Sequence, residues 1–365
     1  MSGAGWLQRH FPAGGLWAAL CLLALLSGCA EQRAILRFDP SGAATTRDIV
    51  WPGPPERARY RYIGELYGQQ NYFKEKAETR EGVKAFLYWV AGLLAGEEQP
   101  IVLQRPLAGA VDEQGRIFVT DASRGAVFVF DAAKNLPMVW ESAGGVNTFV
   151  SPTGIAIGAG GQVLVADAGR GVVVRLDRDG NPLGDIGKGV LTRPTGVAWN
   201  PERKWLYVAD THGHDVKVFD EQGQLLETIG HRGEGDGEFN FPTHLVFAGG
   251  QLYVTDTMNN RIQVFSGDGQ FVRKFGQQGL YLGNLVRPKG VAVDDEGHIY
   301  VVESYFDHLL VFDRDGQFLL PIGGTGPEIG QFYLPAGVWM DRNKRVYVAD
   351  MFNGRVVMFQ FLGEL

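Results

Sequence analysis

Basic side chains recur at corresponding places in the repeated segments of this chain. Arg105, Arg193 and Arg287 each precede a proline that opens a segment, and Lys289 and His244 follow such prolines by one or two residues. Guanidinium and ammonium groups bind carboxylates and phosphates through charge-assisted hydrogen bonds. The pattern therefore predicts a site for an anionic ligand or an acidic segment of a partner. Salt bridges to acidic residues of neighbouring segments are the alternative.

Histidines are the other candidate ligands, because imidazoles hold zinc. Three consecutive segments supply His212, His214, His244 and His308. Three imidazoles and a water would complete a catalytic zinc site, and the protein would then be a metal-dependent hydrolase or lyase. Exposed loop positions for His212 and His214 are the alternative. Calcium needs six or more oxygen ligands, and the apolar runs after the prolines supply almost none. We predict no cofactor, with zinc or calcium as the alternative.

A carboxylate closes one apolar run in each of six repeats, at intervals of 43 to 47 residues. These residues are Asp121, Asp167, Asp210, Asp256, Glu303 and Asp350. A role repeated in every unit is usually architectural, so we expect each carboxylate to accept backbone N–H groups in the following turn.

The repeats are built from short runs that are typical of strands. Residues 290–294, 298–303 and 309–313 are too short for helices and rich in β-branched and aromatic residues. Six repeats of four strands predict an all-β, six-bladed β-propeller. The sixth repeat lacks a fourth strand, and residues 59–64 end like the fourth strands elsewhere. We expect residues 59–64 to pair with residues 356–361 and close the ring.

The same repeats resemble a known family. The pattern YVADxxNxR is met in the fourth repeat at Asn259, Asn260 and Arg261, and in the sixth at Asn353 and Arg355. It resembles the NHL repeat, and the resemblance covers nearly everything after residue 58. It implies a six-bladed β-propeller of the NHL type. The other repeats depart from the pattern and replace the arginine by Ala126, Val172, Asp215 and His308.

The N-terminus predicts export. Residues 15–26 form an apolar run that is too short to span a bilayer, which is typical of a signal peptide over residues 1–28. The string Leu26-Ser27-Gly28-Cys29 resembles the bacterial lipobox, which implies a lipid on Cys29. An ordinary signal peptide with a chance cysteine is the alternative.

Lipid attachment would place the protein in the cell envelope. Ala30 follows the cysteine, which implies the outer membrane, and we expect the periplasmic face. Residues 29–57 are predicted to be a tether that keeps the propeller of residues 58–365 clear of the lipid. The resemblance to lipoproteins of this repeat type implies a place beside other envelope complexes, multihaem cytochromes among them.

The charge and cysteine composition indicate which partners and cross-links to expect. The chain has 34 basic and 41 acidic residues and a formal net charge of −7, and loss of Arg9 with the signal would leave 33 basic residues and a charge near −8. This acidic balance gives no general attraction to nucleic acid. Of the two cysteines, Cys21 lies in the signal and Cys29 is the lipid acceptor, so we expect no disulfide in the mature protein.

One segment interrupts the repeats. Residues 74–97 carry apolar side chains three or four residues apart, which predicts an amphipathic helix. This helix either packs across the propeller or docks a partner or the membrane interface. Its partner-binding residues would be Phe86, Leu87, Trp89 and Val90.

Loops at one face of the predicted ring carry methionine and aromatic residues. The loops between second and third strands supply Met258, Tyr305, Phe306 and Phe352, and residues 279–282 and 332–334 connect blades on the same face. Such side chains suit protein contacts, although packing under the inserted helix is the alternative. The sequence therefore predicts a non-catalytic module that binds another envelope protein. An exported metal-dependent hydrolase or lyase, lactonase-like or amidating-lyase-like, is the alternative.

Overall fold

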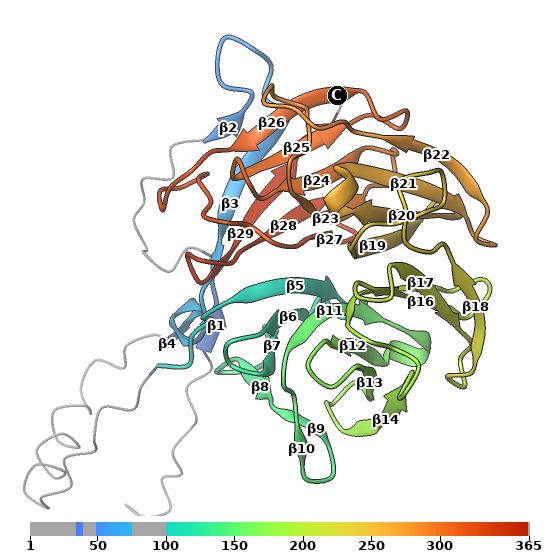
Figure 1. Ribbon diagram of the computed structural model, residues 1–365. Coiled ribbons are helices and arrows are strands. Elements are labelled where there is room, and N and C mark those ends of the chain that lie inside the picture. Colours follow the sequence, from blue (N-terminus) through green and yellow to red (C-terminus); the bar gives the residue numbers. More distant parts are fainter. Residues whose placement is uncertain (1–33, 39–48, 75–99, 364–365) are drawn as a thin grey trace, which may run out of the picture.

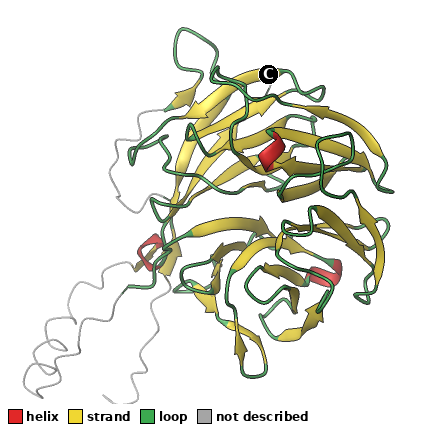
Figure 2. Ribbon diagram, viewed as in Figure 1, coloured by secondary structure: helices red, strands yellow, loops and turns green. Residues whose placement is uncertain are grey.

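The structure, a computed structural model, describes residues 34–38, 49–74 and 100–363. Figure 1 shows antiparallel sheets arranged around a ring. Five sheets have four strands in chain order and the sixth has five, so the predicted all-β, six-bladed β-propeller is confirmed. Figure 2 shows that strands dominate this part of the chain. Its helical pieces are three short 3-10 turns, η1 (Gln69–Asn71), η2 (Ala159–Gly161) and η3 (Thr257–Asn259).

Blades 1 to 3 follow one another along the chain. Blade 1 contains β5 (Pro106–Val111), β6 (Ile117–Asp121), β7 (Ala126–Phe130) and β8 (Met138–Trp140). A hairpin of β9 (Ser142–Gly144) and β10 (Asn147–Thr148) leads to blade 2. Blade 2 contains β11 (Pro152–Ile157), β12 (Val163–Asp167), β13 (Val172–Leu176) and β14 (Pro182–Ile186). Blade 3 contains β15 (Pro194–Asn200), β16 (Trp205–Asp210), β17 (Asp215–Phe219) and β18 (Leu225–Ile229).

Blades 4 to 6 complete the circle. Blade 4 contains β19 (Pro242–Ala248), β20 (Gln251–Asp256), β21 (Arg261–Ser266) and β22 (Phe271–Phe275). Blade 5 contains β23 (Pro288–Val293), β24 (Ile299–Glu303), β25 (His308–Phe312) and β26 (Phe318–Gly323). Blade 6 contains β27 (Val338–Met340), β28 (Arg345–Asp350), β29 (Arg355–Phe361), β3 (Tyr60–Leu66) and β2 (Val50–Trp51).

The core lies between neighbouring blades. Every residue of β6, β12 and β24 is buried, because both faces of each second strand pack against adjacent blades. One cluster joins Tyr300 of blade 5 to Val348 of blade 6, and another joins Phe128 of blade 1 to Tyr347 of blade 6. Apolar runs that are buried on both sides show no strict alternation, which is why the sequence reads as short continuous strands. Burial between blades holds the ring rigid around its central channel.

The first and last parts of the described chain meet in blade 6. Strand β3 pairs antiparallel with β29, and the register places Tyr60 opposite Phe361 and Leu66 opposite Val356 (Figure 1). A buried ion pair joins Arg355 Nη1 of β29 to Glu65 Oε1 of β3 at 2.9 Å. A strand from the start of the propeller therefore completes the sheet that the end of the chain begins.

The predicted tether over residues 29–57 is corrected for the residues that the structure describes. Strand β1 (Ala34–Leu36) pairs with β4 (Tyr72–Lys74), and β2 pairs with β3. Ala34 is 1% exposed and joins the apolar cluster between blades 6 and 1. This part packs on the propeller instead of holding it away, because its apolar residues Ala34 to Leu36 pair with β4 and contact the apolar cluster between blades 6 and 1.

Several predictions fall on other parts of the chain. The signal over residues 1–28 and Cys29 lie outside the described residues, as does the predicted helix apart from Lys74, which ends β4. The helix residues Phe86, Leu87, Trp89 and Val90 are among those outside. Within the described ranges, no helix has the length and apolar character needed to cross a membrane.

Candidate functional site

The six repeated carboxylates are buried and hold the loops that enter each blade. Asp121 accepts the backbone N–H of Arg105 at 3.0 Å, and Asp350 accepts that of Tyr333 at 2.7 Å. The corresponding carboxylates of the other four blades do the same with residues 16 or 17 positions earlier. The predicted bonds to the following turn are confirmed for Asp121, Asp167 and Glu303. The carboxylates are therefore part of the scaffold.

Two blades add an arginine to this arrangement. Arg261 Nε lies 2.8 Å from Asp256 Oδ2, and Arg355 Nε lies 2.8 Å from Asp350 Oδ2. Burial raises the pKa of both carboxyl groups, and hydrogen bonds from backbone and side-chain donors oppose that rise. These two blades have Phe241 or Leu334 before the opening proline, where blades 1, 3 and 5 have arginines.

The three arginines before the opening prolines are exposed on one face of the ring. Within the described part of the chain, the guanidinium groups of Arg105, Arg193 and Arg287 make no ion pair or hydrogen bond. The alternative of salt bridges to neighbouring blades is therefore wrong for these residues: backbone N–H groups already occupy the nearby carboxylates. Arg105 instead lies over the ring of Phe352, 5.4 Å from its centroid.

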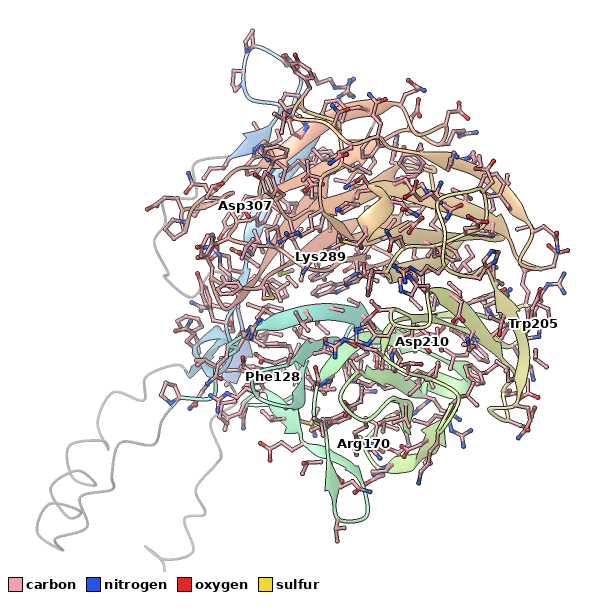
Figure 3. The ribbon with its side chains drawn as sticks, viewed as in Figure 1. Phe128, Arg170, Trp205, Asp210, Lys289 and Asp307 are labelled. Atoms are coloured by element: carbon pink, nitrogen blue, oxygen red, sulfur yellow. The ribbon has the colours of Figure 1, made fainter. Side chains whose placement is uncertain are left out.

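Lys289 and His244 lie deeper in the same mouth, on the inner strands of adjacent blades 5 and 4. Both side chains are half-buried, and Lys289 is labelled near the centre of the ring in Figure 3. Burial lowers the pKa of Lys289, and the charges of Arg287 and Arg105 lower it further. Burial also lowers the pKa of His244 to about 3, with a smaller contribution from Lys289. The basic residues predicted at the channel mouth therefore share one electrostatic environment, except for Arg193.

The four histidines do not gather into a ligand set. His214 Nδ1 accepts the backbone N–H of Phe241 at 3.3 Å, and His308 Nδ1 donates to the Phe306 carbonyl at 2.5 Å. His212 lies edge-on to Phe241, with ring centroids 6.1 Å apart. Among the described residues, no group of three or more histidine, cysteine, aspartate or glutamate side chains is placed to hold a metal ion. The zinc set of these four histidines, which was the alternative to no cofactor, does not fit this geometry.

The loops on this face expose a band of aromatic side chains. Five phenylalanine and tyrosine residues of the described ranges are exposed to solvent, with exposed fractions of 36% to 84%. All of them lie on this face between β18 and β29, and they are Phe241, Tyr281, Tyr305, Tyr333 and Phe352. Met258, Leu280 and Leu282 are exposed among them, while Phe306 is half-buried against Tyr305. We call this set the aromatic rim.

A cavity at the opposite mouth was not foreseen from the sequence. It has a volume of about 1400 Å³ and is lined by the turns between first and second strands. Its charges are largely paired, as in Arg116 with Asp112 at 2.7 Å, and Leu36 and Phe38 form part of its wall. Because residues 29–57 were predicted to be a tether, the sequence did not indicate that Leu36 and Phe38 line a cavity. Paired charges favour a structural role for this mouth.

Comparisons with known proteins agree with this architecture. A family model described as a 6-bladed beta-propeller matches residues 242–304 and 282–364. The human "NHL-repeat-containing protein 4" (Homo sapiens) is 38% identical over 73 residues, which make up 20% of this chain and 58% of that protein. The chain therefore spans less than two thirds of that relative.

Solved structures show the same fold at low identity. A streptogramin B lyase has 12% identity and a TM-score of 0.54, covering 71% of this chain and 94% of that one. A gluconolactonase from Xanthomonas campestris has 18% identity and a TM-score of 0.55, covering 71% and 86%. An auxiliary nutrient binding protein from Bacteroides thetaiotaomicron has 12% identity and a TM-score of 0.58, covering 72% and 71%. At such identities the likeness concerns the fold alone.

Proposed function

Because this chain is a six-bladed β-propeller of the NHL type, we propose that it works as a non-catalytic module that binds another protein of the cell envelope. The observation that carries the proposal is the aromatic rim, in which loops of three successive blades expose aromatic side chains on one face. Exposed apolar side chains on a rigid ring are typical of protein-binding surfaces. Aromatic residues and methionine are also enriched in such interfaces.

The lipid on Cys29 is the second part of the proposal. It would hold the module at the periplasmic face of the outer membrane and so fix where the partner is met. The predicted helix would add Phe86, Leu87, Trp89 and Val90 to the binding surface. Replacing Cys29 by alanine should release the protein from the membrane fraction, and the mass of the mature N-terminal peptide should lose its acyl chains. An unchanged membrane fraction would contradict the anchor.

Site-directed photo-crosslinking in the envelope tests the binding surface. A photoreactive residue at Tyr305 should capture a partner, because Tyr305 is 55% exposed on the rim. The matched control is Ser123, which occupies the corresponding exposed position two residues after the carboxylate of blade 1. Equal capture from both positions, or from neither, would overturn the proposal. Repeating the experiment without residues 83–94 shows whether the predicted helix shares the surface or covers it.

The competing function is an exported metal-dependent hydrolase or lyase at the channel mouth. One observation favours it, since His244 lines the channel cavity and its Nε2 has no hydrogen-bond partner among the described residues. Elemental analysis of protein purified without chelators distinguishes the two functions. Stoichiometric zinc or calcium that is lost in His244→Ala would support the enzyme, whereas a metal-free protein that still crosslinks through Tyr305 would support the binding module.

A further inference from the structure

Lys289 interrupts a run of threonines, two of which tie blade 2 to blade 3 and blade 3 to blade 4. The second residue of the inner strand is Thr153, Thr195 or Thr243 in blades 2 to 4. Thr195 Oγ1 donates to the Thr243 carbonyl of the next blade at 2.8 Å, and Thr153 Oγ1 donates to the Pro194 carbonyl at 3.3 Å. The Lys289 ammonium, at the same position in blade 5, makes no hydrogen bond or ion pair with the described residues.

His244 breaks a second pattern, one residue deeper in the channel. The same position is glycine in four blades, because the inner strands approach closely there. A Cβ on Gly154 would lie 2.5 Å from the Thr195 carbonyl of the next blade. Gly196 of blade 3 likewise faces Thr243 and His244 of blade 4. By the same geometry, the side chain of His244 is directed toward the inner strand of blade 5, where Lys289 lies.

The charge around these two residues is positive and unpaired. Arg287 lies two residues before Lys289, and Arg105 approaches from blade 1 across Phe352 of blade 6. The repeated carboxylate of the same blade as Arg287 is Glu303, which is 1% exposed and accepts the backbone N–H groups of Val286, Arg287 and Tyr305. Half-buried ammonium groups are costly without a counter-charge, so this mouth is preorganised for an anion.

Below His244 the channel turns apolar. A cavity of about 300 Å³ is lined by the inner strands of all six blades, with Ile155, Trp199, Phe247 and Trp339 among its larger side chains. No acidic residue lines it in the described ranges. The indole N–H of Trp339 is buried without an acceptor. A volume of this size lies at the lower end of the range for small-molecule sites.

We propose that the channel binds a small molecule with one carboxylate head and a compact apolar body. The carboxylate lies between Lys289 and His244, and the body enters the cavity toward Trp339. Arg287 and Arg105 attract the anion from the rim side without contacting its body. This site is separate from the rim surface of the proposed function and does not depend on it.

Calorimetric titration of the purified full chain tests the proposal with three probes. Benzoate carries both features, benzylammonium has the same body with the opposite charge, and acetate is the head alone. Benzoate should bind more tightly than either of the other two. Lys289→Thr, which introduces the residue of blades 2 to 4, should weaken benzoate about tenfold or more, because a charge-assisted bond is lost. Lys289→Arg should retain most of the affinity, and Lys204→Thr, an exposed lysine at the other mouth, should change nothing.

Three results would overturn the proposal: no heat with benzoate, equal affinity for benzylammonium, or benzoate binding that survives Lys289→Thr. A measurement on the unmodified chain keeps the test valid if that variant fails to fold. Benzoate should slow acetylation of the Lys289 amine by acetic anhydride, read by peptide mass spectrometry, while Lys204 reacts at its usual rate. Unprotected Lys289 in saturating benzoate would likewise overturn the proposal. Rim crosslinking through Tyr305 is an independent readout, so either proposal can fail alone.

Discussion

Blades 1 to 3 and blades 4 to 6 share one scaffold but present different side chains. All six carry the buried carboxylate that holds the incoming loop. In blades 1 to 3 the turn after the carboxylate is small or polar, as at Ser123, Gly169 and His212. In blades 4 to 6 the same turn exposes Met258, Tyr305 or Phe352. The repeat therefore conserves its geometry around the ring, while the positions that the geometry leaves free differ between the halves.

The second half also contains most of the unusual polar residues. The two arginines that pair with repeated carboxylates, Arg261 and Arg355, lie in blades 4 and 6, and His244 and Lys289 interrupt the small residues of the inner strands in blades 4 and 5. Blades 1 to 3 have glycine or alanine at the His244 position. A ring that needed only stability could repeat one blade six times. The departures from the repeat are concentrated in one half, which is the half that carries the aromatic rim of the proposed binding surface.

The largest expected effect concerns the arginines that pair with the repeated carboxylates of blades 4 and 6. Arg355→Met should lower the free energy of unfolding by about 3–5 kcal/mol, because it leaves Asp350 and Glu65 buried without their cation. Arg261→Met should cost less, since only one carboxylate, Asp256, loses its cation. Urea unfolding monitored by tryptophan fluorescence measures both variants. Equal losses would show that the bond to β3 contributes nothing to ring closure.

Removal of the aromatic rim should have the next largest effect, on partner binding. Combined Tyr281→Ser, Tyr305→Ser and Phe352→Ser should weaken the complex by more than about 2 kcal/mol, which is roughly thirtyfold, because aromatic anchors dominate interface energy. Stability should change little, since these side chains are exposed. The affinity for the crosslinked partner provides the measurement. As a control, Ser123→Ala and His212→Ala in blades 1 and 3 should leave binding intact.

How far the sequence predicts this molecule depends on how local each signal is. The strands, the number of blades and the carboxylate positions follow from short repeated patterns. The strand of residues 59–64 was also recognisable, because it has the same ending as the other fourth strands, and the structure pairs Tyr60 with Phe361. The segment around Ala34 was not recognisable as a strand, since its partner β4 supplies only three residues and lies close to the predicted helix.

The candidate site was predicted less completely, because it depends on side-chain surroundings. The sequence could place Arg105, Arg287, His244 and Lys289 at one mouth from their positions beside the opening prolines. It could not show that backbone N–H groups saturate the carboxylates and leave the arginines unpaired. The sequence also could not show that the histidines lie apart, since His308 forms a hydrogen bond with the carbonyl of Phe306 in its own loop.

The pH dependence of stability sharpens the comparison at the inner strands. His244 has a folded pKa of about 3, below its ordinary value near 6.5. The unfolded chain therefore binds a proton that the folded chain does not, and stability is lost as the pH falls from about 6.5 toward 3. The slope for one proton is at most about 1.4 kcal/mol per pH unit. His244→Gly, which restores the residue of blades 2 and 3, should remove this contribution.

Urea unfolding of both proteins between those pH values measures the difference. The contributions of the other titrating groups cancel when the free energy of unfolding of the variant is subtracted from that of the wild type. The difference should move in favour of His244→Gly as the solution becomes more acidic. A constant difference would mean that the pKa of His244 is the same in the folded and the unfolded chain. Blade 4 would then not differ from blades 2 and 3 in its contribution to the pH dependence of stability.

The smallest expected effect separates the arginines of the two halves. Arg287 and Arg193 occupy the same exposed position in blades 5 and 3, and neither is paired within the described ranges. If the partner covers blades 4 to 6, Arg287→Gln should slow association at low salt by an amount worth about 0.2–1 kcal/mol. Arg193→Gln should change the rate less, because its charge lies farther from the contact. Both differences should shrink at high salt as the charges are screened. Equal effects of the two variants would place the partner over the whole ring. The two halves would then differ in their exposed side chains but not in their contribution to partner binding.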